Sequence, residues 1–322
     1  SNKNAIINGN FGIWQRGTSI STNGYTADRF RTQLSGSTHV STRQVFTAGQ
    51  TDIPNEPTYY HRTVVTSVAG ASNYCLLQQR IESVRTYAGK TVTLNFYAKA
   101  DASKNIAVEF EQDYGSGGTP SSGIAEIGIT TCALTTSWQR FTITASIPSI
   151  LGKTLGTNND GFLSLQVWFE AGSTYNSRTN SLGQQSGTFD IAQVQLEEGS
   201  SFTSFEYRTI GQEIALCQRY YEKSYNQSAA LDSSDSGDTF FVSTGAANYR
   251  FTETFKVSKR AGPTMSIYNA SLAGGTTIRN YTAVSSVAYT VGVTTERLFN
   301  ISPSSPVNEN LYAFHWTADA EL

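Results

Sequence analysis

Alternation of apolar and polar residues is the dominant pattern over most of this chain. Apolar side chains occupy every second position in residues 92–98, 106–110 and 163–169. Because successive side chains of a β-strand point to opposite faces, each run predicts a half-buried strand. Segments rich in glycine, asparagine and proline separate these runs, and no helical pattern lies between them. We therefore expect an antiparallel two-sheet sandwich in residues 1–207.

The segment FDIAQVQLE, residues 189–197, predicts a further strand that contains an irregularity. Its apolar positions change parity between Ile191 and Val194. One extra residue in a strand shifts the alternation in this way, so we expect a β-bulge near Ala192 and Gln193.

Residues 7–19, with the sequence INGNFGIWQRGTS, predict a short strand, an Asn-Gly turn and a second alternating stretch. Asparagine and glycine both tolerate positive φ, which makes this pair a strong turn signal. We expect Phe11 and Ile13 to face the core. Trp14 and Gln15 should lie at the edge of the sandwich.

A helical pattern follows the sandwich and predicts a linking helix in residues 208–225. Thr209 and Gln212 have the spacing of a capping box. One apolar stripe at helical spacing comprises Ile210, Ile214, Cys217 and Tyr221. The stripe is compatible with packing on the same chain or on a neighbouring subunit.

Residues 226–322 return to strand patterns and predict a smaller C-terminal β-domain. The expected strands are Tyr249–Val257, Thr264–Tyr268, Ala288–Val293 and Leu311–Trp316. The loop before them carries Asp232, Asp235 and Asp238 but lacks the ordered glycine and glutamate of an EF-hand. We expect it to be a solvated loop.

Composition narrows the possible partners. The net charge is −2, and charged residues make up 15% of the chain, against about 25% in typical soluble domains. Such a chain has no basic field to hold nucleic acid, and no apolar run is long enough to insert into a membrane. The three cysteines form no CxxC pair, so we expect buried thiols and assembly in a reducing cytoplasm.

Motifs for catalysis are lacking in the sequence. The histidines have no metal-binding spacing, and no GxSxG elbow occurs. Glu109, Glu111 and Asp113 form the densest acidic set, which we interpret as a solvated sheet face rather than a glycosidase pair. We therefore expect a protein that is not an enzyme.

Three segments resemble bacteriophage tail-fibre proteins, in the same order along the chain. They are NGNFGIWQRGTS at 8–19, EIALCQRYYEKS at 213–224 and ADAEL at 318–322. The NGNF segment, the TVTLNFYAKA strand and the FDIAQVQLEEG strand together resemble jelly-roll carbohydrate-binding modules. The resemblance implies an all-β protein with an N-terminal jelly-roll β-sandwich.

The same resemblance implies a function and partners. It indicates a virion fibre or tip adhesin that is assembled in the host cytoplasm, forms a homotrimer and contacts other virion proteins. Its ligand would be a host surface polysaccharide or lipopolysaccharide. A capsid or tail decoration protein that binds no receptor is the main alternative, and a glycan-cleaving enzyme is a third.

Sugars are held by aromatic faces beside planar polar side chains. Trp168 and Gln166 alternate with the apolar face of their strand, and Tyr97 opposes Phe96. We therefore expect Trp168, Tyr97 and Gln166 to form an exposed glycan site, unless another sheet, domain or subunit covers them. On this hypothesis Trp168→Ala weakens binding without unfolding the protein.

The resemblance to carbohydrate-binding modules also implies a structural calcium ion. Asp190 and backbone oxygens around Asn8 would supply its ligands. The FDIAQV segment has a single carboxylate. A bond from Asp190 to the local backbone is the alternative.

Overall fold

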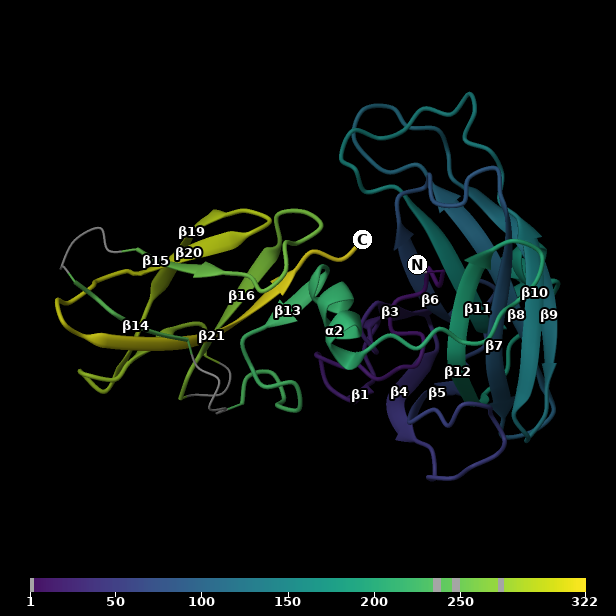
Figure 1. Cartoon of the computed structure of the whole chain (residues 1–322), viewed down its shortest axis with the longest axis horizontal. Helices are drawn as coiled ribbons and strands as arrows, with labels where there is room; N and C mark the ends of the chain where they lie inside the picture. Colours follow the sequence, from purple (N-terminus) through teal and green to yellow (C-terminus); the bar gives the residue numbers. More distant parts are fainter. Residues whose placement is uncertain (1–2, 234–238, 245–249, 272–274) are drawn as a thin grey trace. The chain divides into compact units, whose positions relative to one another are not determined.

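The computed structural model is built almost entirely of β-strands, which confirms the all-β prediction. It describes residues 3–233, 239–244, 250–271 and 275–322. The chain forms two compact units (Figure 1). The N-terminal unit contains the residues up to Trp14, Thr18–Arg208 and Leu322, and the C-terminal unit contains Gln15–Gly17 and Thr209–Glu321.

Two six-stranded antiparallel sheets form the N-terminal unit. Sheet A has the order β1 (Ser19–Ile20), β4 (Thr38–Val45), β5 (Tyr59–Thr66), β12 (Gly187–Glu198), β7 (Thr91–Ala100), β10 (Gln139–Ser146). Sheet B has the order β2 (Gly24–Tyr25), β3 (Phe30–Ser35), β6 (Tyr74–Glu82), β11 (Phe162–Ala171), β8 (Lys104–Asp113), β9 (Ile124–Leu134). The chain passes repeatedly from one sheet to the other, as in a jelly roll.

The alternating runs form the strands that the sequence predicts. Val92, Leu94 and Phe96 of β7 face the core, and Leu163 and Leu165 of β11 meet them from the opposite sheet. The polar residues of these strands point to the outer faces, because side chains alternate along a strand. Burial of the apolar set therefore holds the two sheets together.

The predicted β-bulge is confirmed in β12, where the register with β7 shifts between Ala192 and Gln195. Gln193 has φ 48°, and its amide nitrogen donates to the Pro54 carbonyl at 3.1 Å and to the Tyr207 hydroxyl at 2.6 Å. A bulge redirects a side chain out of the regular alternation. Here it lets Gln193 anchor the loop between β4 and β5 over the outer face of sheet A.

A polar network crosses the core of the N-terminal unit near His61, which is fully buried. The His61 ring nitrogens lie 3.1 Å from the Thr26 hydroxyl and 3.3 Å from the Thr63 hydroxyl. Thr63 is linked through Ser41 to His39. Burial lowers the pKa of His61 to about 3, so the ring is neutral at physiological pH.

The N-terminal segment differs from the prediction, because residues 3–17 contain no strand. Asn8 has φ 60°, and its side chain replaces strand pairing by bonding to Ile13 and Asp28. Phe11 and Ile13 are buried, as expected. Trp14 is buried rather than at an edge, and its ring stacks on His61 at 5.4 Å.

Gln15 is also buried and lies in the C-terminal unit, not at an edge of the sandwich. Its amide nitrogen donates to the Tyr221 carbonyl at 2.7 Å. The Arg16 guanidinium lies 3.6 Å from the centre of the Tyr221 ring and pairs with Asp319 at 3.1 Å. The segment Gln15–Gly17 is therefore a structural part of the C-terminal unit.

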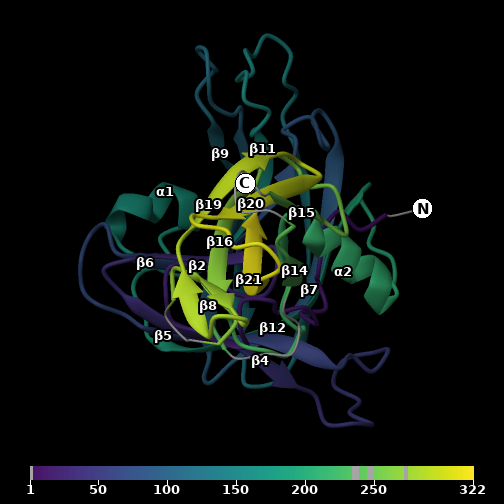
Figure 2. The ribbon, with the colours of Figure 1, turned by 90° about the vertical axis from the view of Figure 1, so that its left-hand side faces the viewer.

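The predicted helix is shorter than expected. The helix α2 spans Ile210–Gln218 (Figure 2). The capping box of Thr209 and Gln212 is in place at its start. The Gln218 carbonyl accepts a hydrogen bond from the buried Lys259 ammonium at 2.6 Å, which satisfies the end of the helix. Tyr221–Lys223 is then a strand, β13, paired with residues 317–319. Ile210 at the start of the predicted stripe is 68% exposed.

The described residues of the C-terminal unit form two sheets. In one, β21 (Leu311–Asp319) pairs with β13, β14 (Thr239–Val242), β16 (Thr264–Asn269) and β17 (Ile278–Asn280), and β17 pairs with β18 (Ser285–Val287). The other has the order β15 (Phe251–Thr254), β20 (Leu298–Pro303), β19 (Tyr289–Thr294). An aromatic core that includes Phe241, Phe299, Phe314 and Trp316 holds them together.

Two predicted features fall partly outside the described residues. Tyr249, at the start of an expected strand, lies there, as do Asp235 and Asp238 of the polar loop. Asp232 belongs to a turn.

All three cysteines are described, and each is buried without a disulfide. Within the described part of the chain, no helix is long and apolar enough to cross a membrane.

Candidate functional site

Three aromatic side chains gather at the outer face of sheet A. The Phe46 and Tyr60 ring centres are 4.7 Å apart, and both rings lie within 5.4 Å of Trp138. Tyr60 and Trp138 meet edge to face at 84°. All three side chains are half-buried, so each keeps part of its ring open to solvent. We call Phe46, Tyr60 and Trp138 the aromatic patch.

The sheet order brings these distant residues together. Tyr60 belongs to β5, Phe46 follows β4, and Trp138 precedes β10 at the opposite edge. Beneath them, Tyr97 of β7 packs with Ile53 of the anchored loop. Tyr97 is only 8% exposed, so the expectation that it forms an exposed glycan platform is wrong. Its ring supports the aromatic patch from below.

Charged groups border the aromatic patch. The Arg62 guanidinium donates to both carboxylate oxygens of Asp190, from Nε at 2.8 Å and from Nη2 at 2.9 Å. Arg62 also lies 3.4 Å from the Tyr60 hydroxyl. Burial, with the nearby Asp190 charge, raises the pKa of Tyr60. The Lys99 ammonium lies 5.2 Å from the centre of the Trp138 ring, within cation–π range.

These contacts do not fit the expected calcium ion. Asp190 is committed to Arg62 and lies 3.8 Å from the Lys99 ammonium, so two cations already face its carboxylate. The backbone oxygens around Asn8 are also engaged: the Asn8 carbonyl accepts from the Phe11 amide at 2.8 Å, and the Gly9 carbonyl accepts from the Val194 amide at 2.9 Å. Among the described residues, no group of three or more His, Cys, Asp or Glu is placed to hold a metal. The bond to Arg62 also replaces the backbone bond considered for Asp190.

Trp168 points to the outer face of sheet B, as its parity predicts, but it is not exposed. It is 1% exposed and forms a separate cluster with Leu76, Ala107 and Ala171. The segment after β11, with the short helix α1 (Asn176–Thr179), covers it, and Tyr175 lies 5.2 Å from its ring. The expectation of an open sugar platform at Trp168 is therefore wrong.

The acidic set on β8 is not a solvated face either. Glu109 is fully buried, and its carboxylate accepts hydrogen bonds from Trp168 Nε1 at 3.1 Å, Arg178 Nε at 2.8 Å and the Glu126 amide at 2.9 Å. Burial raises its pKa despite these partners. Glu111 bonds to Gln166 and to Arg178. The two carboxylates therefore share one arginine and leave Glu109 no open side for a substrate.

Gln166 belongs to the same network. It is 3% exposed, and its amide oxygen accepts from Arg178 at 3.3 Å. Both ends of the amide therefore have protein partners, and the expectation that Gln166 lies open to a ligand is wrong. The network of Arg178, Glu109, Glu111 and Gln166 instead fastens α1 over sheet B.

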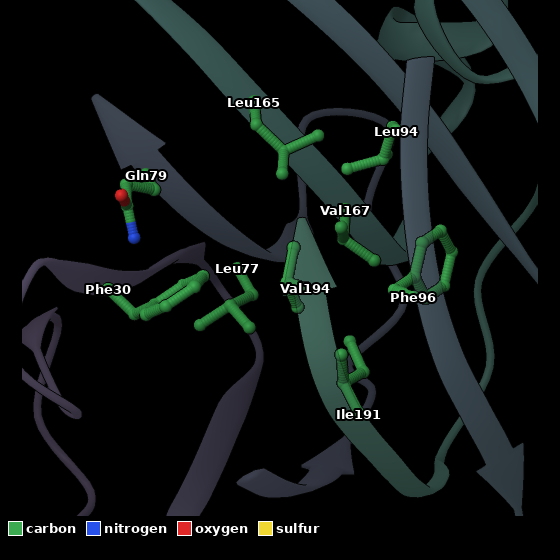
Figure 3. Close-up of a pocket in the computed structure, with 9 residues that line it drawn as sticks. All are labelled: Phe30, Leu77, Gln79, Leu94, Phe96, Leu165, Val167, Ile191 and Val194. Carbon is green, nitrogen blue, oxygen red and sulfur yellow. The ribbon is translucent and has the colours of Figure 1, made fainter. Parts of the chain in front are cut away.

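A small cavity inside the sandwich is unsuited to a sugar. Figure 3 shows Leu94 and Phe96 facing Leu165 and Val167 across it. Its volume is about 10 Å³, room for one water at most. Gln79 is the one polar residue that lines it, and its amide is bonded to the Ile7 backbone at both ends.

The aromatic patch was missed by sequence reasoning. Its residues are distant in sequence, and none stands within an alternating run that marks it as outward-facing. The one usable signal was the WQRF segment at 138–141, where Trp138 precedes a strand whose apolar residues begin at Phe141. Its partners depend on the order of strands in sheet A.

Comparison with known proteins gives distant structural likenesses. The enzymatically active domain of tailspike protein 4 from bacteriophage CBA120 has 12% identity and a TM-score of 0.33, with 61% of this chain and 22% of that chain covered. This chain therefore spans about a fifth of that tailspike structure. No protein-family model and no curated protein matches the sequence.

Two carbohydrate-binding structures are similar at the same level. The family 11 carbohydrate-binding module from Clostridium thermocellum, in complex with a mixed-linked tetrasaccharide, has 11% identity, coverage of 58% and 99%, and a TM-score of 0.33. The N-terminal cellulose-binding domain of Cellulomonas fimi β-1,4-glucanase C has 17% identity, coverage of 51% and 90%, and a TM-score of 0.30. At these TM-scores the likenesses say nothing about function. The β-sandwich assignment rests on the sheet topology of this chain.

Proposed function

We propose that this protein is a non-enzymatic glycan-binding adhesin of a phage virion, and that the aromatic patch binds the glycan. The observation that carries this proposal is the group of three half-open rings on the outer face of sheet A. Aromatic faces on a rigid support bind the apolar faces of sugar rings. The tail-fibre resemblance of three separate segments supports the virion context.

Polar groups at the edge of the aromatic patch provide directed hydrogen bonds. The Lys99 ammonium and the Tyr60 hydroxyl are donors, and the carboxylate of Asp190 holds Arg62 in a fixed orientation. A sugar stacked on Trp138 would then find hydroxyl partners at its rim. A single weak site of this kind becomes effective when several copies engage one surface, which is why we also propose a homotrimer.

The test is binding of the labelled full chain to an array of purified bacterial capsular polysaccharides and lipopolysaccharides. We expect selective binding that Trp138→Ala abolishes. The matched control is Leu151→Ala, which removes an apolar side chain that is 90% exposed and lies outside the aromatic patch. Both variants should remain folded at the temperature of the binding assay, which circular dichroism checks.

Three results would contradict the proposal. Equal binding by Trp138→Ala and the parent protein would remove the aromatic patch from the site. A folded protein that binds no glycan on the array would favour a decoration protein, and sugar release from a bound polysaccharide would favour an enzyme.

A further inference from the structure

A second cavity lies at one end of the N-terminal unit, among the segments that follow β6, β8 and β10. Its volume is about 180 Å³. The residues that line it include Glu82, Ser83, Arg85, Tyr114 and Asn159. We call this cavity the loop pocket. It shares no described residue with the aromatic patch.

Hydrogen bonds between the loops hold the loop pocket open. The Ser83 amide donates to the Gly161 carbonyl at 3.1 Å, and the Gly156 amide donates to the Tyr114 carbonyl at 2.8 Å. A Cβ at Gly156 would lie 2.3 Å from the Ser116 carbonyl oxygen, so only glycine allows this close approach. The walls are therefore formed before any ligand arrives.

Two residues of the wall have left-handed backbone conformations. Ser83 has φ 72° and Asn159 has φ 53°. Asparagine tolerates this region, whereas serine keeps it only where the surrounding contacts impose it. Here they turn the chain so that two loops meet at the rim of the loop pocket.

The chemistry of the lining matches a ligand with a polar ring. Tyr114 and Val84 are buried and provide an apolar floor. The rim offers a carboxylate from Glu82, a guanidinium from Arg85, an amide from Asn159 and a hydroxyl from Ser83. These groups include both donors and acceptors, as the hydroxyls of a sugar require. An engineered cavity of about 150 Å³ accommodates benzene, so the size admits one six-membered ring.

We propose that the loop pocket is a second binding site, which takes a single neutral pyranose. The lining carries one carboxylate, from Glu82, and one guanidinium, from Arg85, so it has no net charge that favours an acidic or a basic sugar. This inference does not depend on the aromatic patch. It gives the same β-sandwich two independent sites at different surfaces.

The test is an NMR titration of the isotope-labelled full chain with methyl glycosides of glucose, galactose, mannose, rhamnose and N-acetylglucosamine. Each is added to roughly 50 mM, far above the Kd of about 1 mM that corresponds to 4 kcal/mol. We expect saturable shifts at the amides of Ser83, Arg85 and Asn159 with at least one neutral glycoside. Methyl glucuronide is included as the acidic comparison.

Two variants remove polar groups from the loop pocket. Asn159→Gly and Ser83→Gly keep the left-handed conformation, because glycine adopts it without strain, and Ser83→Gly also removes the hydroxyl that accepts from the Arg85 amide at 3.2 Å. We expect Asn159→Gly to weaken the binding by a factor of about ten, corresponding to one lost hydrogen bond. Unchanged spectra with all five neutral glycosides would overturn the proposal, as would undiminished affinity in Asn159→Gly or stronger binding of methyl glucuronide.

The two sites can be tested apart from each other. Trp138→Ala should leave the shifts at the loop pocket intact, and Asn159→Gly should leave binding to the polysaccharide array intact. A failed array experiment with a successful titration would reject the adhesin proposal and keep the loop pocket. The reverse pattern would reject the loop pocket alone.

Discussion

Arg62 and Asp190 stand directly opposite each other on β5 and β12, and two parallel hydrogen bonds of 2.8 and 2.9 Å join them. The Asp190 side chain is 4% exposed and that of Arg62 is 32% exposed. The pair thus links two neighbouring strands at the border of the aromatic patch. Two-point pairs of this kind fix orientation as well as adding energy, so the position of Tyr60 beside Arg62 depends on it.

Asp190→Asn should therefore destabilise the N-terminal unit. The variant loses one charged hydrogen bond and leaves the Arg62 charge without its partner, at an expected cost of about 1–3 kcal/mol in the free energy of unfolding. Urea denaturation measures the change. Asp101→Asn is the control, because its carboxylate is 46% exposed and 3.8 Å from Lys104.

A chelator should leave the melting temperature of the parent protein unchanged, and a fall in Tm with chelator would restore the calcium hypothesis for Asp190.

The aromatic patch gives a graded prediction at Tyr60. Tyr60→Phe keeps the ring and loses the hydroxyl, with its contact to Arg62 and its one hydrogen bond to the glycan, so glycan affinity should fall by a factor of about three. Tyr60→Ala removes the ring and its edge-to-face contact with Trp138, and affinity should fall roughly tenfold or more. Surface plasmon resonance on the polysaccharide selected by the array measures both. Equal losses in the two variants would mean that the hydroxyl, not the ring, contacts the glycan.

Trp168→Ala should lower the free energy of unfolding, rather than weaken glycan binding with no loss of stability. Its ring is buried beneath α1 and donates to Glu109, so truncation creates a cavity and costs about 3–5 kcal/mol of stability. Trp168→Phe retains most of the volume and should cost less. Thermal denaturation distinguishes them. A Trp168→Ala protein as stable as the parent would show that the cover over Trp168 opens freely.

The neutral His61 predicts loss of stability in acid. Its pKa is about 3 in the folded protein and near 6.5 in an unfolded chain. Between these values the unfolded state binds a proton that the folded state does not, so the free energy of unfolding falls as the pH falls. For this group alone the loss between pH 7 and pH 4.5 is about 2.5 kcal/mol.

Two measurements check the His61 prediction. The NMR signal of the His61 ring should not titrate above pH 4 in the folded protein. In His61→Gln, the slope of stability against pH should be smaller than in the parent over pH 4.5–6.5. A ring that titrates near pH 6.5 while the protein stays folded would contradict the closed network around Thr26 and Thr63.

Local alternation accounts for the part of the fold that the sequence predicts correctly. The strands β7, β8 and β11 follow the parity of their apolar residues, and the parity change before Val194 marks the β-bulge. The end of α2 was misjudged because Tyr221 continues the helical spacing and is also buried as a strand residue. Its pairing partner, Asp319, lies almost a hundred residues further on, where no local pattern can indicate it.

The candidate site shows the same limit. The parity of Trp168 correctly gives its face of the sheet, but its burial depends on Tyr175 and Arg178, which return over that face after the strand ends. Conversely, the aromatic patch exists only because sheet A places β5 and β10 on either side of β12 and β7. Sequence patterns describe one strand at a time, whereas a site on a sheet depends on the order of several.

The position of Gln15 and Arg16 within the C-terminal unit has a consequence for biosynthesis. Gln15 leaves the ribosome 206 residues before Tyr221, whose carbonyl it binds. The segment is thus available long before the strands that receive it, and the C-terminal unit can be completed only after β21 has been translated. A recombinant fragment that begins at Thr209 would lack this segment, so attempts to produce the C-terminal unit alone should supply residues 15–17 as a peptide or by circular permutation.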